Sequence, residues 1–261
     1  MMAILILVAG MAIGSFLGAL SYRLPRGQTV MEGRSLCDHC KRKIAWQDNI
    51  PFFSYLFLGG RCRHCNRQIS KRYPFIELST GLIFLGIYFL LNNCSGELAQ
   101  TLCNWKVSLK LLTLPFLLFV ASVMITIFVI DLEQKLIPDE LSLFGFLIVL
   151  VAAIFLASFF ANVFAGFLVS VILLLIHLVT KGRGMGLGDV KLALFAGTFL
   201  GWPYALTWLF IAFLTGAAVG IILILAGRAS FGKQIPFGPF LVFSFFITIV
   251  VGSNFLNLIL K

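Results

Sequence analysis

Long apolar stretches separated by short polar segments dominate this 261-residue chain. A helix needs about 20 apolar residues to cross the hydrocarbon core of a bilayer, and stretches of about that length recur along the chain. The predicted spans lie near residues 2–22, 74–92, 111–131, 140–160, 163–180, 188–201, 204–227 and 236–260. The pattern therefore predicts an all-α polytopic membrane protein with about eight transmembrane helices.

The apolar run from residue 141 to residue 180 is too long for a single span. As one helix it would measure roughly 60 Å, about twice the hydrocarbon thickness. We therefore expect the chain to fold back within this run, most simply near Ala161–Asn162. The first span resembles a signal peptide in position, but it lacks a preceding basic residue and the usual small-residue cleavage site, so we interpret it as a retained helix.

Composition agrees with a membrane location, because 60% of the residues are hydrophobic and only 11% are charged, which excludes a soluble domain of this size. The net charge of +10 is distributed unevenly: eleven of the twenty Lys and Arg lie between Arg23 and Arg72. With alternating spans, the other short basic loops fall on the same side. The positive-inside rule then places residues 23–73 in the cytoplasm and both termini on the opposite, outer side of the membrane. Topology explains the charge, so we expect the lipid bilayer as a partner and no nucleic acid.

The segment from residue 23 to residue 73 interrupts the apolar pattern and contains two C-x-x-C pairs, Cys37 with Cys40 and Cys62 with Cys65. Four thiolates at this spacing are typical of a structural zinc site, which can order a segment too small to form its own core. Two disulfides or four free thiols are the alternatives, and a reducing cytoplasm disfavours the disulfides. His39 and His64 lie inside the pairs and are alternative ligands, although exposed loop positions are the commoner role for such residues.

These features predict three parts. Residues 1–22 form a first transmembrane helix, residues 23–73 a small cytoplasmic zinc-binding domain, and residues 74–261 a transmembrane core. Cys94 and Cys103 fall in a predicted external loop, where a disulfide and two free thiols are equally compatible with an oxidising compartment.

Acidic residues are informative in this chain because a carboxylate at membrane depth is costly and usually functional. Asp131 closes an apolar run, and Asp189 lies in the sequence Gly186-Leu-Gly-Asp189 at the start of another. The alternating topology places both at the cytoplasmic membrane face, so we expect them to meet. Two facing carboxyl groups share a proton, since both cannot ionise. One can then activate water while the other protonates or hydrogen-bonds the reacting amide.

Simpler roles exist for several polar residues near these aspartates. Asp139 follows Pro138 and resembles a helix N-cap, and Asp189 also has the position of a cap. Asp131 lies at a helix C-terminus, where the macrodipole disfavours a negative charge and a capping role is excluded. Alternating glycines from Gly182 to Gly188 indicate a tight turn that delivers Asp189 to a partner helix. His177 is interpreted as an interfacial side chain.

At this point the motifs resemble one family, the type IV prepilin peptidases. The resemblance runs from about residue 10 to residue 242. Its motifs are Gly14-Ser-Phe-Leu17, Tyr22-Arg-Leu-Pro25, the two C-x-x-C pairs enclosing Asn49-Ile-Pro-Phe-Phe-Ser-Tyr55, Arg72-Tyr-Pro-Phe-Ile-Glu77, Asp131 with Pro138-Asp139, Gly186-Leu-Gly-Asp189 and Ile235-Pro-Phe-Gly-Pro-Phe240. Gly18 and Gly59 depart from the residues usual in this family.

The resemblance implies an aspartic endopeptidase that removes a short basic leader from type IV prepilin-like or pseudopilin substrates at the cytoplasmic face. It implies that Asp131 and Asp189 are the catalytic pair. It also implies that Cys37, Cys40, Cys62 and Cys65 bind zinc, and that the protein is the form of the enzyme that N-methylates the product with S-adenosylmethionine. Two other functions stay open: a G-x-G-D membrane protease with other substrates, such as a presenilin-like one, and a carboxylate-dependent transporter. A zinc-bearing scaffold is a third, but it would leave both aspartates unexplained.

Overall fold

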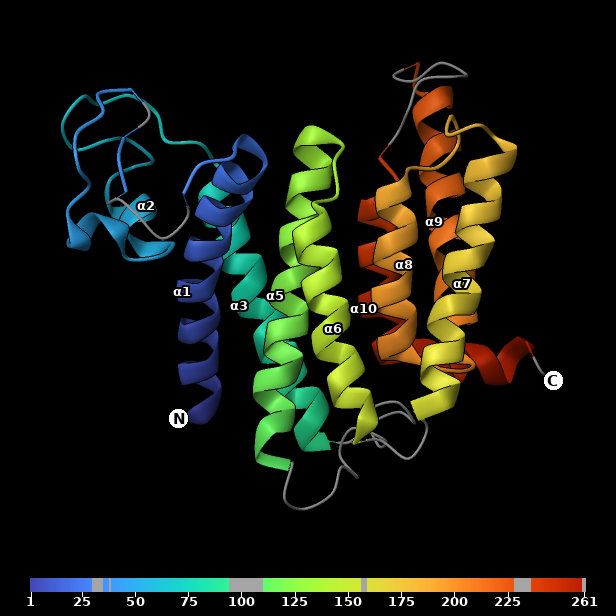
Figure 1. Cartoon of the computed structure of the whole chain (residues 1–261). Helices are drawn as coiled ribbons and strands as arrows, with labels where there is room; N and C mark the ends of the chain where they lie inside the picture. The colour runs from blue at the N-terminus through green and yellow to red at the C-terminus, as the bar shows by residue number, and fades with distance from the viewer. Residues whose placement is uncertain (30–34, 38, 94–109, 156–158, 228–235, 260–261) are drawn as a thin grey trace. The chain divides into compact units, whose positions relative to one another are not determined.

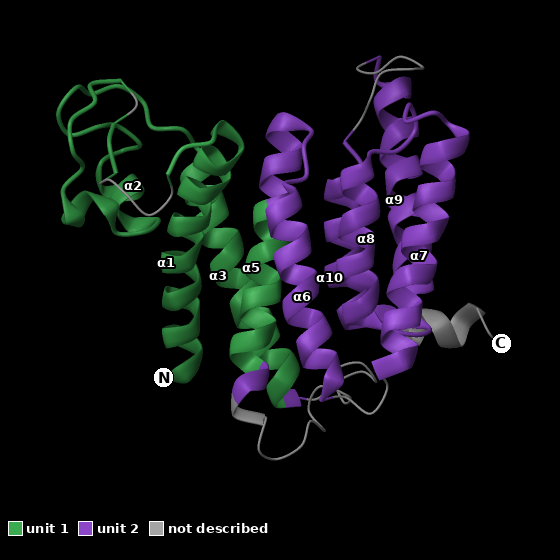
Figure 2. Ribbon diagram, in the orientation of Figure 1, with its two compact units in different colours: residues 1–92, 114–126 green, residues 93–113, 127–261 purple. Residues whose placement is uncertain are grey.

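The computed structural model describes residues 1–29, 35–37, 39–93, 110–155, 159–227 and 236–259 (Figure 1). The chain divides into two compact units (Figure 2). One comprises residues 1–92 and 114–126, and the other comprises residues 93–113 and 127–261. Helix α5 (Lys110–Gln134) contributes to both units. Apolar helices make up most of each unit, as the sequence predicts.

Helices α1 (Met2–Arg23) and α3 (Arg72–Asn93) pack antiparallel in the first unit. Glycines spaced four residues apart on α1 permit this approach, because a Cβ on Gly10 would lie 2.8 Å from the Cα of Gly81, and one on Gly14 would lie 2.8 Å from the Cα of Glu77. Small residues at this spacing let membrane helices come into close contact. Helix α1 ends where Pro25 enters the short 3-10 helix η1 (Leu24–Arg26).

The segment between α1 and α3 has little regular structure among its described residues. It contains the 3-10 helix η2 (Trp46–Asn49) and the short helix α2 (Phe53–Phe57). Two isolated antiparallel bridges join Leu36 to Lys43 and Arg61 to Gln68. This architecture agrees with a segment that is ordered by its side-chain chemistry instead of a large apolar core.

The second unit is a bundle arranged around helix α8 (Leu187–Leu200). Helices α6 (Asp139–Ile154), α7 (Phe159–Val179), α9 (Tyr204–Leu225) and α10 (Gly238–Ile259) all contact it. Close packing of α7 on α8 is possible at Gly166 and Gly197, where a Cβ on Gly197 would lie 2.9 Å from the Cα of Gly166. Trp208 of α9 is fully buried and its Nε1 donates a hydrogen bond of 2.8 Å to the carbonyl of Leu241 in α10.

Each predicted span contains a helix, but the helices differ in their ability to cross a bilayer. Among the described residues, five helical stretches are long and apolar enough by length and composition, at residues 2–26, 72–93, 112–134, 159–179 and 204–225. The structure therefore supports a multi-pass membrane protein with five candidate spans, and the prediction of eight is not confirmed. Helix α8 has 14 residues and measures about 21 Å, which is shorter than the hydrocarbon core.

The predicted fold-back near Ala161–Asn162 is wrong by several residues. Helix α6 ends at Ile154 and α7 begins at Phe159, so Ala161 and Asn162 lie in the first turn of α7. Asn162 is buried, and its side chain lies against Gly201. The polar residue that suggested a turn therefore packs inside the unit, and the break falls in an apolar stretch.

Candidate active site and metal centre

Asp131 lies in the last turn of α5 and is 5% exposed. Its Oδ2 atom is buried and has no hydrogen-bond partner of normal geometry among the described residues. The backbone N–H of Gly238 lies close enough to the same carboxyl group to stabilise its charge. A buried carboxylate oxygen without a partner is costly in a purely structural role, so this atom is free to act on another molecule.

Gly238 is the first residue of α10 and leaves room for the Asp131 carboxyl group. A Cβ at this position would lie 2.5 Å from Oδ2 and 3.0 Å from Cγ of Asp131. The positive end of the α10 macrodipole therefore faces the carboxylate. This placement offsets the unfavourable position of Asp131 at the C-terminal end of its own helix.

Asp189 is the third residue of α8 and is 7% exposed. Its Oδ2 accepts a hydrogen bond of 3.0 Å from the backbone N–H of Gly186. The N-cap residue is Gly186, so Asp189 is not itself the N-cap but caps the helix with its side chain from the third helical position. Only one carboxylate oxygen is used in this bond, so capping and a chemical role are compatible.

The ends of α5, α8 and α10 meet at the two aspartates. The charges of Asp131 and Asp189 are close enough to repel each other. Ile137, in the loop after α5, lies against the starts of both α8 and α10. A Cβ on Gly188 would lie 2.8 Å from Ile137 Cβ, and a Cβ on Gly238 would lie 3.2 Å from Ile137 Cδ1. The structure therefore brings the two sequence-predicted aspartates together within one unit, although 58 positions separate them in the chain.

The turn before Asp189 is held by His177 and by Thr180. The His177 Nδ1 atom lies 2.7 Å from the carbonyl oxygen of Met185, and the backbone N–H of Gly184 donates to Thr180 Oγ1 at 3.2 Å. Gly182 adopts φ +76, a left-handed conformation that glycine tolerates best. The glycine-rich segment thus forms the predicted tight turn, and His177, in the last turn of α7, contacts it.

Asp139 does not cap α6, which corrects the sequence-based interpretation. The N-cap residue is Pro138, and Asp139 occupies the first helical position without a side-chain cap hydrogen bond. Its Oδ2 pairs instead with Lys191 Nζ of α8 at 2.6 Å. The pair is partly exposed, so it contributes little more than about 1 kcal/mol. Glu133 and Glu140 are exposed, as expected for interfacial charges.

Cys37, Cys40, Cys62 and Cys65 form a cluster in which all four sulfur atoms lie within 4.8 Å of one another. Four sulfurs around one zinc ion at about 2.3 Å would lie about 3.8 Å apart, and the Cys37 and Cys65 sulfurs are separated by 3.8 Å. The backbone N–H of Cys40 lowers the pKa of the Cys37 thiol to about 7, against the effect of burial. Against the backbone N–H of Arg67, burial and the neighbouring thiols raise the pKa of the Cys65 thiol to about 11. These shifts oppose each other, so it is the arrangement of the four sulfur atoms that fits a metal ion.

The two cysteine pairs lie in equivalent turns, a repeat that the sequence interpretation missed. Cys37 N–H donates to the carbonyl of Arg42 at 3.0 Å, and Cys62 N–H donates to that of Arg67 at 2.9 Å. In both turns the residue after the second cysteine has positive φ, at Lys41 and Asn66. Each feature recurs 25 positions later, from 37 to 62 and from 41 to 66. The sequence itself repeats, because the pattern C-x-H-C-x-R-x-I occurs at 37–44 and again at 62–69, so the signal was available without the structure.

The two histidines inside the pairs stand apart from the sulfur cluster. His39 and His64 are both exposed, and the Nδ1 atom of His39 lies 3.4 Å from Nη1 of Arg67. The metal-binding cluster found among the described residues contains the four cysteines alone. Cys94 and Cys103 lie outside the described residues, so the predicted alternatives for them stay open.

Glu77 is a further buried carboxylate, which the sequence interpretation quoted only as part of a motif. It is 7% exposed in α3, its Oε2 accepts a 2.7 Å hydrogen bond from Phe52 N–H, and its side chain also bonds to Ser15. The sequence signal that could have identified Glu77 is the presence of a carboxylate within a predicted membrane span. Glu77 joins α1, α3 and the segment that precedes α2.

Comparison with known proteins identifies the family. Residues 8–91 match the bacterial peptidase A24 N-terminal domain, and residues 118–221 match the type IV leader peptidase family. Proteins named prepilin leader peptidase/N-methyltransferase from Aeromonas hydrophila and Vibrio cholerae are each 32% identical to this chain. The alignments cover 96% of the chain and 91% of the first relative, and 94% of both the chain and the second.

A relative of the same name from Pseudomonas aeruginosa is 30% identical over 95% of this chain and 90% of its own length. No solved structure matches the chain. The resemblance found in the sequence is therefore confirmed, and the chain belongs to the type IV leader peptidase family.

Proposed function

We propose that this protein is an aspartic endopeptidase that removes the basic leader from prepilin-like substrates at the cytoplasmic face of the inner membrane. The buried pair formed by Asp131 and Asp189 carries the proposal, because it combines two interacting carboxyl groups with an Asp131 oxygen that has no hydrogen-bond partner of normal geometry among the described residues. The names of the relatives support the prepilin leader as the substrate. No observation favours a transporter.

The chemistry requires one carboxylate and one carboxylic acid. The ionised aspartate removes a proton from water as the water oxygen attacks the scissile carbonyl carbon, and the protonated aspartate donates a hydrogen bond to the developing oxyanion. The tetrahedral intermediate then collapses as the C–N bond breaks and a proton moves to the leaving amine. The positive end of α10 at Gly238 favours the negative charge of the ionised aspartate before it takes the proton from water.

A cleavage assay tests this proposal directly. The substrate is a membrane-reconstituted protein with a basic leader, a glycine, a phenylalanine and then an apolar helix. We expect a single cut after the glycine. Cleavage at several sites within the apolar helix would instead favour a G-x-G-D protease with other substrates, and no cleavage would contradict the proposal.

We propose that the four-cysteine cluster binds a structural zinc ion. The sulfur separations and the set of four thiol donors support this choice over a disulfide pair. Zinc would hold the two equivalent turns together and so order a segment of 51 residues (23–73) that has few buried apolar side chains.

Metal analysis provides the first prediction. We expect purified protein to contain about one zinc ion per chain, and we expect Cys37→Ser combined with Cys62→Ser to lose it because each turn then lacks one ligand. Cys94→Ser combined with Cys103→Ser is the matched control and should keep the metal. Absence of zinc from wild-type protein prepared under reducing conditions without chelator would contradict the proposal.

We also propose that the protein N-methylates the new N-terminus, as the names of its relatives state for those proteins. S-adenosylmethionine would supply the methyl group. This donor is large and polar, whereas the described transmembrane helices are mostly apolar, so its site should involve residues 23–73. The same segment carries eleven basic and three acidic residues, a net formal charge of +8, and lies between two membrane helices.

A second prediction separates the two activities. Cys37→Ser combined with Cys40→Ser should reduce methylation much more than cleavage, because the aspartate pair lies in the second unit and the cysteine cluster in the first. Mass spectrometry of the processed substrate N-terminus measures both reactions at once. Recovery of fully methylated product at the wild-type level would contradict the proposal.

The proposed topology keeps the predicted layout of residues 1–22, 23–73 and 74–261, with eight crossings and the active site facing the cytoplasm. The distribution of basic residues supports this orientation. Helices α6, α8 and part of α10 would complete the eight crossings inside the second unit, where they pack against longer neighbours.

A further inference from the structure

A cluster of large apolar side chains projects outward from the cysteine-containing segment. Phe53, Leu56 and Phe57 share one face of α2, since they are three and four positions apart. Phe57 is 87% exposed and Leu56 is 57% exposed. Trp46 of η2 is 76% exposed, and Ile50 lies between the two short helices. We call these five residues, Trp46, Ile50, Phe53, Leu56 and Phe57, the apolar wedge.

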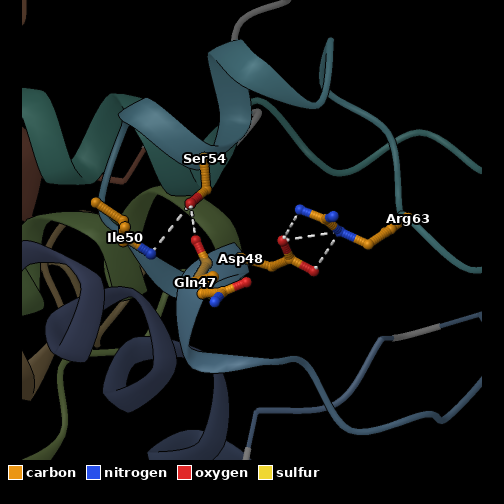
Figure 3. A network of polar contacts seen from close by, with 5 residues as sticks. All are labelled: Gln47, Asp48, Ile50, Ser54 and Arg63. Carbon is orange, nitrogen blue, oxygen red and sulfur yellow. Dashed lines mark hydrogen bonds and ion pairs between the residues drawn. The ribbon is translucent and has the colours of Figure 1, made fainter.

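Polar contacts join the segments that carry the wedge (Figure 3). Ser54 Oγ donates to the carbonyl of Gln47 at 2.7 Å and accepts from the backbone N–H of Ile50 at 3.1 Å. Arg63, inside the second C-x-x-C pair, binds Asp48 through both carboxylate oxygens, at 2.6 to 3.1 Å. These contacts tie η2, α2 and the second cysteine turn together, so the exposed apolar side chains belong to a folded segment.

The depth of the wedge follows from the hydrogen bond between Phe52 and Glu77. Glu77 lies five residues into α3, opposite Gly14, which is nine residues before the end of α1. At 1.5 Å per residue, Glu77 lies about 8 to 14 Å below the cytoplasmic ends of these helices. Phe52 immediately precedes α2, so α2 begins beside the helices and not beyond them. Figure 1 shows the same placement, with α2 at the height of the C-terminal half of α1.

The residues around the wedge indicate which kind of molecule the wedge contacts. Apolar residues of α1, such as Leu5 and Phe16, are exposed in the same way. In a membrane-spanning helix such side chains face lipid. Trp and Phe at the edge of a basic segment are typical of the membrane interface. The surrounding segment has a net formal charge of +8, which complements the anionic headgroups of a cytoplasmic leaflet.

We infer that the apolar wedge inserts between the lipids of the cytoplasmic leaflet, so that the cysteine-containing segment is itself a monotopic membrane element. Phe53, Leu56 and Phe57 contact acyl chains, and the neighbouring basic residues contact headgroups. The segment is therefore fixed laterally against α1 and α3 at the membrane surface. This inference does not depend on the catalytic roles of Asp131 and Asp189.

Site-specific photo-cross-linking tests the inference in the full-length protein. Phe57→p-benzoylphenylalanine keeps an aromatic ring at the wedge, and Arg42→p-benzoylphenylalanine places the same probe on an exposed residue among the basic residues Lys41, Arg42 and Lys43. Both variants are reconstituted into vesicles of phosphatidylethanolamine and phosphatidylglycerol and irradiated. We expect covalent phospholipid adducts, detected by mass spectrometry, to be several-fold more abundant at residue 57 than at residue 42.

Other outcomes would overturn the inference. Equal lipid labelling at both positions, or none at residue 57, would show that the wedge is not inserted. A covalent dimer, or an adduct with added substrate and not with lipid, would show that a protein occupies this face. The same probe at Phe53 provides an independent position if the variant at residue 57 fails to fold, and it should give the same result as residue 57.

Discussion

Asp131→Asn and Asp189→Asn are each expected to lower kcat/KM for leader cleavage at least about 10³-fold, the scale seen when one member of a catalytic group is removed. Asparagine has nearly the same shape as aspartate, but it can neither remove a proton from water nor share a proton with its neighbour. Both variants should insert normally. Cleavage is measured with reconstituted substrate at equal amounts of membrane-inserted enzyme.

Asp139→Asn is the matched control, because it makes the same chemical change at the start of α6, where Asp139 pairs with Lys191. The partly exposed pair contributes little, so activity should change by no more than a few-fold. An inactive Asp139→Asn variant together with a fully active Asp131→Asn variant would show that the catalytic pair is assigned incorrectly.

Gly238→Ala is expected to lower cleavage about 10²-fold, the scale of a 1 Å displacement of a reacting group. The added Cβ would come within 2.5 Å of Asp131 Oδ2, and the contact includes the reactive carboxyl group itself. Ile137 Cδ1, at 3.2 Å from the same Cβ, limits movement in another direction. The carboxyl group must therefore shift relative to Asp189.

Gly220→Ala is the control for this prediction, because a Cβ at Gly220 in α9 meets nothing within 4 Å. Alanine there should leave activity unchanged and favour the helix slightly. The two variants are compared by cleavage rate and by thermal unfolding of the detergent-solubilised protein. Wild-type activity of Gly238→Ala would contradict the close approach of α10 to Asp131.

The positions of Asp131 and Asp189 could be predicted because carboxylates are rare in apolar sequence and because alternating spans place both at one membrane face. The contribution of Gly238 could not be predicted in this way. Its effect depends on the approach of α10 to α5, and 107 positions separate Gly238 from Asp131 in the chain. Sequence spacing identifies reactive groups more readily than it identifies the backbone that surrounds them.

The helical spans were predictable from hydrophobicity, but their ends were not always so. The break between α6 and α7 lies next to Phe155, which is not a typical turn residue, whereas Asn162 is used for packing against Gly201. Asp139 looked like a cap because it follows Pro138, yet Lys191, distant in sequence, competes for its carboxylate. In each case a tertiary contact overrode the local signal.

The buried hydrogen bonds of Glu77 have a consequence for how the chain is assembled in the membrane. A carboxylate that enters lipid without partners is costly, and here the partners are Ser15 and the backbone of Phe52. Both partners are synthesised before α3. We therefore expect the translocation machinery to release α3 into the bilayer only as a hairpin with α1, after the intervening cysteine-containing segment has taken up its position during synthesis.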